Sequence, residues 1–148
     1  MGTDNTMIAT AETIEQYIPQ RAPFIMVDNL LEADEKVTVT SKEVKEDMLF
    51  VRKGKLQTAA LVENIAQTAA AGVGYRCAQA EKDVPLGFIG GIKGFQLQKH
   101  PLVGETITTT VTVKNEVFGA SIVEGVITIN EEVIASAELK IFIEQDEA

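Results

Sequence analysis

The chain has 148 residues and 45% of them are hydrophobic, which is enough for one domain with a buried core. Its 13 basic and 22 acidic residues give a net charge of -9, which argues against nucleic acid and anionic membrane surfaces as partners. With no spanning hydrophobic stretch, no signal sequence and one cysteine, we expect a soluble cytoplasmic protein without a zinc-type metal site or another cofactor.

The chain begins with a polar segment followed by short apolar runs. Residues 1–12 are polar, and we expect them to be frayed. Residues 13–18 could form a short helix that ends before Pro19. Residues 24–31 are predicted to form a strand, and residues 36–44 alternate apolar and polar side chains as a half-buried strand does.

One long helix is predicted from about residue 57 to 80, and the rest of the chain consists of strands. The four predicted strands cover residues 86–97, 105–118, 120–129 and 133–143. Polar turn residues separate the last three strands, so hairpins and an antiparallel sheet are expected.

The many alanine and glycine residues of the predicted helix have small side chains or none, so the helix can pack closely against a sheet. A helix that is apolar almost all round is usually buried. A helix of about twenty residues spans roughly 30 Å, which matches the length of a strongly curved sheet. The sequence therefore predicts an α+β hotdog fold over residues 1–148, with a long central helix wrapped by a curved antiparallel sheet of about six strands. Such a sheet leaves an edge strand open, so a dimer is expected.

Glu63 is a carboxylate in this otherwise apolar helix, and Gln67 lies one turn further along the same face. Asn64 and Thr68 widen the polar sector. One interpretation is a solvated stripe on the edge of the helix. The other is a carboxylate in an apolar cavity, where it can act as a general acid or base.

Three cations, Arg52, Lys53 and Lys55, precede the predicted helix. A solvated loop would explain them. Their position also suits a phosphate, because the free N–H groups at a helix N-terminus attract anions. A phosphopantetheine arm would fit such a site, and Arg76, Lys82, Lys93 and Lys99 could extend the basic patch.

The predicted strand after the helix contains Phe88, Gly90 and Gly91, and glycine in a strand marks a bulge or the close approach of a ligand or backbone. The single histidine, His100, follows this strand in a polar loop before a proline. Such a histidine is more often exposed than catalytic.

Three motifs in this order resemble the β-hydroxyacyl-acyl-carrier-protein dehydratases. Residues 18–28, IPQRAPFIMVD, are similar to their opening Leu-Pro-His-Arg-x-Pro-Phe-Leu-x-Val-Asp. Residues 63–67, ENIAQ, resemble their helix motif Glu-x-x-Ala-Gln, and residues 88–92, FIGGI, their central glycine-bearing strand. The resemblance covers residues 17 to 143.

The resemblance implies a hotdog dimer with acyl tunnels at the interface, where a glutamate and a histidine from the neighbouring subunit remove water from a 3-hydroxyacyl thioester. It assigns Glu63 and Gln67 to the catalytic site, and Phe88, Gly90 and Gly91 to substrate binding. The histidine does not match, because Leu49 occupies its place. Gln57-Thr58 stands at the helix start instead of the Pro-Gly whose N–H polarises the thioester carbonyl, and the Thr58 N–H could still do so.

Residues 50–56 look like a divergent branch of predicted dehydratases from aryl-polyene-type pathways, which also lack this histidine. The sequence thus favours a 3-hydroxyacyl thioester dehydratase that acts on acyl carrier protein or coenzyme A thioesters as a homodimer. One alternative is an inactive acyl-binding subunit that forms a heterodimer with a second hotdog protein. A second alternative is a hotdog acyl thioesterase.

Overall fold

The computed structural model describes residues 7–83, 87–117 and 119–143. One 3₁₀ turn, η1 (Ile14–Gln16), precedes the strands β1 (Asn29–Ala33) and β2 (Val37–Glu43). A small hairpin, β3 (Val51–Arg52) and β4 (Lys55–Leu56), leads into the helix α1 (Thr58–Gln79). Four longer strands follow: β5 (Gly87–Leu97), β6 (Thr106–Val117), β7 (Ala120–Ile129) and β8 (Glu132–Ile143).

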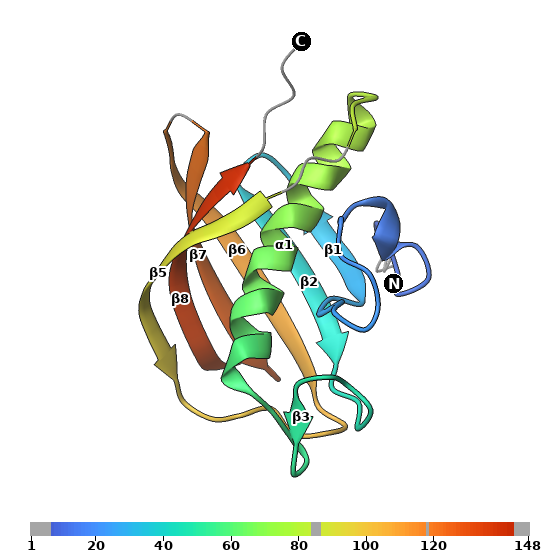
Figure 1. Ribbon diagram of the computed structural model, residues 1–148, viewed down its shortest axis with the longest axis vertical. Helices are drawn as coiled ribbons and strands as arrows, with labels where there is room; N and C mark the ends of the chain where they lie inside the picture. Colours follow the sequence, from blue (N-terminus) through green and yellow to red (C-terminus); the bar gives the residue numbers. More distant parts are fainter. Residues whose placement is uncertain (1–6, 84–86, 118, 144–148) are drawn as a thin grey trace.

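The six long strands form one antiparallel sheet in the order β1-β2-β6-β7-β8-β5. Figure 1 shows the sheet curving around α1, which lies across its concave face, while the hairpin β3–β4 sits at the N-terminal end of the helix. The predicted hotdog fold is therefore confirmed. Strand β5 forms one edge of the sheet, and β1 forms the other.

The C-terminal hairpin follows directly from its sequence. Along β7 most alternate residues are buried, from Val123 and Gly125 to Ile127 and Ile129, as expected for a strand with one face on the core. Asn130 and Glu131, which join β7 to β8, both have positive φ angles, 50° and 69°. Two such residues form the turn that matches the twist of a two-stranded hairpin, and asparagine adopts this conformation at little cost.

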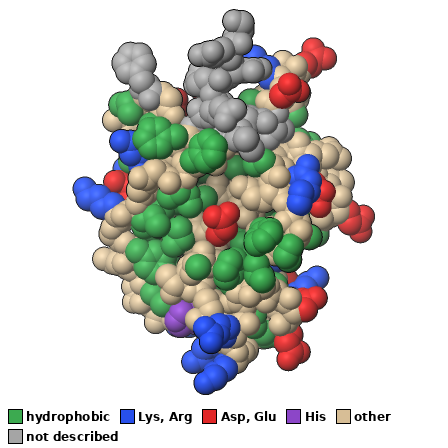
Figure 2. All heavy atoms as spheres, in the orientation of Figure 1, with side chains coloured by type: hydrophobic (Ala, Val, Ile, Leu, Met, Phe, Trp, Pro, Cys, Tyr) green, Lys and Arg blue, Asp and Glu red, His purple; other side chains and the backbone are tan. Residues whose placement is uncertain are grey.

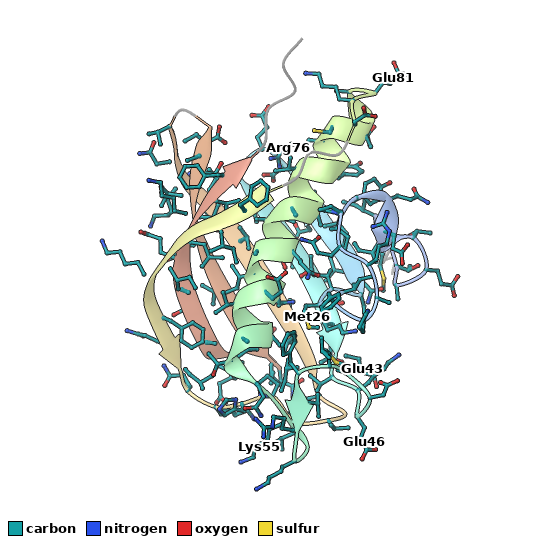
Figure 3. All side chains as sticks on the ribbon, viewed as in Figure 1. Met26, Glu43, Glu46, Lys55, Arg76 and Glu81 are labelled. Atoms are coloured by element: carbon teal, nitrogen blue, oxygen red, sulfur yellow. The ribbon has the colours of Figure 1, made fainter. Side chains whose placement is uncertain are left out.

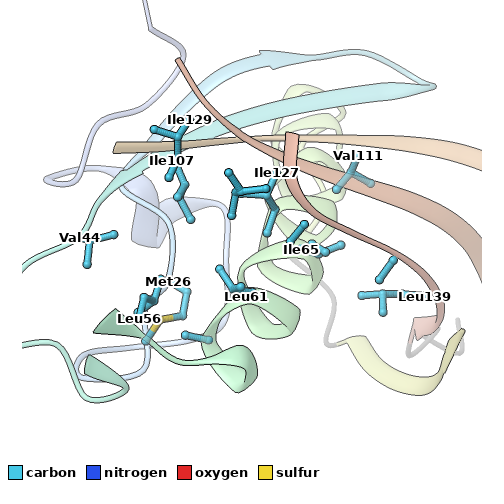
Figure 4. Packing of buried hydrophobic residues seen from close by; sticks show 14 of the residues in the cluster. Met26, Val44, Leu56, Leu61, Ile65, Ile107, Val111, Ile127, Ile129 and Leu139 are labelled. Atoms are coloured by element: carbon cyan, nitrogen blue, oxygen red, sulfur yellow. The ribbon is translucent and has the colours of Figure 1, made fainter. Parts of the chain in front are cut away.

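Helix and sheet meet through aliphatic side chains with very little space between them. Ile65 on α1 packs directly over Gly125 of β7, where an added Cβ atom would lie only 2.4 Å from Ile65 Cγ2. Figure 4 shows Ile65 between the helix and the sheet together with Leu61, Ile127 and Leu139. The glycine thus allows the helix to approach the centre of the sheet.

The polar residues Asn64 and Thr68 are buried rather than solvated. Thr109 Oγ1 donates a hydrogen bond to Asn64 Oδ1, and the hydroxyls of Thr40 and Thr68 lie 2.7 Å apart. Thr68 Oγ1 also donates to the Asn64 carbonyl oxygen at 2.7 Å. These bonds tie α1 to β2 and β6, so the interpretation as a solvated stripe is wrong for these two residues.

Asp34 closes the turn between β1 and β2. Its Oδ1 accepts the N–H groups of Lys36 and Val37, each at 2.8 Å. These backbone hydrogen bonds, that of Val37 first, hold the pKa of Asp34 below its usual value of 3.8. Arg76 Nη1 donates to the Asp34 carbonyl oxygen at 2.6 Å, which fastens the end of α1 to this turn.

Several predicted boundaries differ from the structure. The first strand begins at Asn29 instead of residue 24, and the short helix is a single 3₁₀ turn. Residues 8 and 9 are not frayed, because the Ile8 and Ala9 N–H groups both donate to the Leu30 carbonyl oxygen, while residues 1–6 lie outside the described part of the chain. The hairpin β3–β4 was not predicted, and residues 86 and 118 of the predicted strands are not described.

Candidate active site

A cavity of about 480 Å³ lies between α1 and the sheet. Such a volume is in the range of small-molecule binding sites. Figure 2 views the molecule from the side of the helix and shows an acidic side chain near the centre of this face, surrounded mainly by hydrophobic ones. The cavity is lined by Gln20, Thr38, Glu63, Ala66, Ala69, Ala70, Val73, Arg76, Gly87, Phe88, Ile89, Val111, Val113, Glu116, Ser121, Val123 and Ile141.

The helix contributes one face to this cavity. Glu63, Ala66, Ala70 and Val73 recur every three or four residues, so they stack along the same side of α1. From Glu63 to Arg76 this face extends about 20 Å. The small alanine side chains leave room for the cavity, which larger side chains would fill. Among the helix residues that line the cavity, Glu63 is the acidic one.

Glu63 is half-buried, and its carboxylate is held by Gln67. Gln67 Nε2 donates a hydrogen bond to Glu63 Oε2 at 3.0 Å. The same amide group donates to the Phe24 carbonyl oxygen at 2.8 Å, and Gln67 Oε1 accepts the Met26 N–H at 2.7 Å. Gln67 is fully buried, so it fixes the carboxylate and the neighbouring chain together.

The segment that Gln67 binds is the apolar run predicted to be the start of a strand. It instead lies along the side of α1, and Figure 3 shows Met26 beside the helix. Asn64 Nδ2 donates to the Met26 carbonyl oxygen at 2.8 Å, which completes the attachment. The backbone groups of Phe24 and Met26 therefore pair with helix side chains rather than with a neighbouring strand.

Of the three β5 residues predicted to bind substrate, Phe88 lines the cavity, together with its neighbours Gly87 and Ile89. Gly90 lies under the ring of Phe142, where an added Cβ atom would meet the Phe142 ring. Gly91 follows an irregularity in the pairing of β5 with β8. The two glycines thus shape the strand and accommodate an aromatic side chain, and neither is on the cavity wall.

The basic residues Arg52, Lys53 and Lys55 are exposed on the hairpin β3–β4, at the N-terminus of α1. Gln57, the N-cap residue, makes no side-chain hydrogen bond to the helix, and Thr58 is exposed. Figure 3 shows Lys55 at this end of the molecule and Arg76 at the other end of the helix. Arg76 therefore does not extend the basic patch, and neither this patch nor Thr58 lines the cavity of Glu63.

Leu49 and His100 both lie near the start of α1. Leu49, which takes the place of the family histidine, is an exposed aliphatic side chain in the loop before β3. His100 is half-buried, and its Nδ1 lies 2.9 Å from the Leu56 carbonyl oxygen, so Nδ1 carries the hydrogen in the neutral ring. The expectation of an exposed loop histidine is thus wrong, although His100 does not line the cavity of Glu63.

Gln20 was not predicted as a site residue, yet its side chain lines the same cavity as Glu63. It belongs to the motif IPQR, in which the related dehydratases typically have histidine. This departure in an otherwise matching motif was the available signal. Ser121 and Glu116 also line the cavity and carried no recognisable signal in the sequence.

In the described residues, no helix is long and apolar enough to cross a membrane. The same residues contain no group of three or more histidine, cysteine or acidic side chains that could hold a metal ion.

The architecture defines a hotdog protein with a carboxylate, Glu63, on its central helix. The family model of the ApeP-like dehydratases, described as ApeP dehydratase, matches residues 12–148, and the chain belongs to this family. It is also 29% identical over 139 residues to 3-hydroxyacyl-[acyl-carrier-protein] dehydratase FabZ of Cereibacter sphaeroides, which covers 90% of this chain and 89% of the relative. The predicted family is confirmed.

Solved structures show the same fold. A chain of the dehydratase heterocomplex ApeI:P from Xenorhabdus doucetiae superposes with a TM-score of 0.84 at 16% identity, covering 90% of this chain and 91% of that one. A hypothetical thioesterase with coenzyme A from Streptococcus pneumoniae superposes with a TM-score of 0.63 at 12% identity, covering 80% of this chain and 87% of that one.

Proposed function

We propose that this protein acts in the dehydration of 3-hydroxyacyl thioesters, with Glu63 as the group that transfers protons. The observation that carries the proposal is the half-buried Glu63 carboxylate, held by Gln67 on the wall of an elongated and mainly apolar cavity. Such a cavity suits an acyl chain, and the carboxylate lies where a reacting carbon can approach it.

The reaction breaks a C–H bond at C2 and the C–O bond at C3, forms a double bond between these carbons and releases water. One group must accept the C2 proton, and one must give a proton to the departing hydroxyl. Glu63 supplies a carboxylate for one of these transfers. The free N–H groups at the start of α1, at Thr58, lie outside the cavity of Glu63. Where the thioester end of the substrate extends to the helix start, they would polarise its carbonyl and so make the C2 proton easier to remove.

The hairpin β3–β4 would receive the arm that carries the acyl group. Arg52, Lys53 and Lys55 place three exposed cations next to the N-terminus of α1 in an otherwise acidic chain. A phosphopantetheine arm, on a carrier protein or on coenzyme A, brings a phosphate that these cations and the helix N-terminus attract.

A second subunit would cover the open edge of the sheet. Strand β5 is an edge strand, and Phe88 and Ile92 on it are 55% and 50% exposed. An edge strand with exposed apolar side chains is a site for pairing with another chain. A homodimer through β5 is the simplest assembly that pairs this edge.

A second candidate function is favoured by Leu49. An exposed leucine cannot transfer a proton, so the second group of the dehydration has no counterpart at this position. The chain could then serve as the carboxylate-bearing subunit of a heterodimer, in which another hotdog protein supplies a histidine. The likeness to a chain of the ApeI:P dehydratase heterocomplex agrees with this candidate.

The test is to incubate the purified protein with 3-hydroxyacyl-carrier protein, alone and with a histidine-bearing hotdog protein from the same organism, and to look by mass spectrometry for loss of water. Loss of water by the protein alone supports the first candidate, and loss only with the partner supports the second. In either case Glu63→Gln should lower the rate about 100-fold or more. The absence of enoyl product from both samples, or an unchanged rate in Glu63→Gln, would refute the role of Glu63. Release of free thiol instead of water would indicate a thioesterase.

A further inference from the structure

The side chain of Gln20, a residue that lines the cavity, has a hydrogen-bonding atom without a partner. Its Oε1 atom is fully buried and has no hydrogen-bond partner. Among the described residues, no other buried side-chain nitrogen or oxygen atom lacks a partner. Gln20 lines the cavity that also contains Glu63. Buried polar groups in folded proteins are nearly always hydrogen-bonded, so an exception on a cavity wall calls for an explanation.

The backbone around Gln20 is held in place independently of this side chain. Arg21 Nη1 donates to the carbonyl oxygens of Ile18 and Gln20 at 2.7 and 2.8 Å. Further along the segment, Gln67 binds the backbone of Phe24 and Met26. The position of Gln20 is therefore fixed by contacts on both sides, while its side-chain carbonyl oxygen has no hydrogen-bond partner.

The chemistry of the atom limits what can bind to it. An amide oxygen only accepts hydrogen bonds, so its partner must be a donor. In the acyl part of a 3-hydroxyacyl thioester, the carbonyl oxygen, the sulfur and the alkyl chain offer no donor. The 3-hydroxyl group is the one donor, and it belongs to the reacting end of the substrate, where Glu63 acts in the proposed function.

We propose that Gln20 Oε1 accepts a hydrogen bond from the 3-hydroxyl group of the substrate and so selects hydroxylated acyl chains over saturated ones. This inference rests on the proposed function. Gln20 is a positioning residue, because a carboxamide does not transfer protons near neutral pH. The enoyl product has lost the hydroxyl group as water, so it loses this hydrogen bond and is released more readily.

The test uses the Glu63→Gln variant, in which bound substrate stays intact. Dissociation constants are measured for 3-hydroxyoctanoyl-pantetheine and octanoyl-pantetheine, with Gln20 present and in the double variant with Gln20→Met. We expect the hydroxylated compound to bind about tenfold more tightly when Gln20 is present, as one neutral hydrogen bond allows. Gln20→Met has a similar volume and should bring this ratio close to one, with little change for octanoyl-pantetheine.

In the active protein, or in its complex with the partner, Gln20→Met should raise KM and leave the pH profile of kcat unchanged. Its melting temperature should not fall, because the replaced atom has no partner to lose. An equal preference for the hydroxylated compound in both variants, or failure of both compounds to bind, would overturn the proposal. A Gln20-dependent preference without any loss of water from 3-hydroxyacyl-carrier protein would instead refute the proposed reaction and leave the binding role of Gln20 standing.

Discussion

The carboxamide of Gln67 joins Glu63 to the backbone of Met26: its Nε2 lies 3.0 Å from Glu63 Oε2 and its Oε1 lies 2.7 Å from the Met26 nitrogen. One buried side chain thus fixes a carboxylate on the helix and a segment that lies about forty positions earlier in the sequence. The orientation of Glu63 in the cavity consequently depends on this amide.

Replacement of Gln67 by methionine should therefore affect stability and activity together. Gln67→Met leaves the buried Met26 N–H without its partner, which costs about 1–3 kcal/mol, and it also removes the part-buried hydrogen bond to the Phe24 carbonyl oxygen. We expect a lower free energy of unfolding in denaturant titration and a lower kcat. Glu63→Gln is the matched control, because it should abolish activity and change stability by less than about 1 kcal/mol. Equal stability of Gln67→Met and the wild type would contradict the structural role of the amide.

The basic hairpin should contribute to binding of the carrier protein through charge. Lys53→Glu combined with Lys55→Glu should weaken binding of a phosphopantetheinylated carrier protein at least about tenfold at low salt. The difference should shrink as ionic strength rises, because salt screens exposed charges. Lys82 is exposed beyond the other end of α1, so Lys82→Glu alone matches the charge change of Lys53→Glu alone but lies away from the hairpin. Titration calorimetry at two salt concentrations measures all three variants, and equal weakening by the two single variants would show that only the total charge matters.

The edge strand β5 should carry the subunit contact. Ile92 is 50% exposed in this strand, and a carboxylate there would be buried by a second chain without a partner. Ile92→Glu is expected to yield monomers in light scattering at concentrations where the wild type, or its complex with the partner, is dimeric. Val133 in β8 is 46% exposed and lies beyond the stretch of β8 that pairs with β5, so Val133→Glu should leave the mass unchanged. A dimer that survives Ile92→Glu would exclude β5 as the interface.

The contact between Ile65 and Gly125 should be sensitive to a single methyl group. Gly125→Ala places a Cβ atom against the Ile65 side chain, and overpacking of this kind typically costs about 1–3 kcal/mol. In the double variant with Ile65→Ala the clash disappears, so the two changes should destabilise by less than the sum of their separate effects. Thermal unfolding of the four proteins measures this coupling. Additive effects would mean that the helix shifts away from the sheet and that the close packing is not required.

Local sequence patterns were sufficient to predict the long helix, the hairpins of the second half and their arrangement as a hotdog fold. Residues 105–143 alternate apolar and polar side chains with turn residues such as Asn130 between them, and strand periodicity is a local property of the chain. The motif ENIAQ likewise singled out Glu63 by its resemblance to a known family.

The tertiary structure decided what the polar residues of the helix do. Periodicity places Glu63, Asn64, Gln67 and Thr68 in one sector of the helix, but it does not say what faces them. Their partners come from residues 24–26 and from strands β2 and β6, far away in the sequence, and these partners bury Asn64, Gln67 and Thr68. Glu63 alone is left half-buried at the cavity.

The first apolar run and Gln20 show the same limit. Residues 24–27 are typical of a strand, but the backbone groups of Phe24 and Met26 bind side chains on α1, and a sequence pattern does not distinguish these partners from a neighbouring strand. Gln20 stands in a recognisable motif, yet only the folded chain brings it to the wall of the cavity that Glu63 also lines. The sequence determined the elements and the candidate acid, because these depend on neighbouring residues, whereas the cavity and the residues that complete it depend on contacts between distant segments.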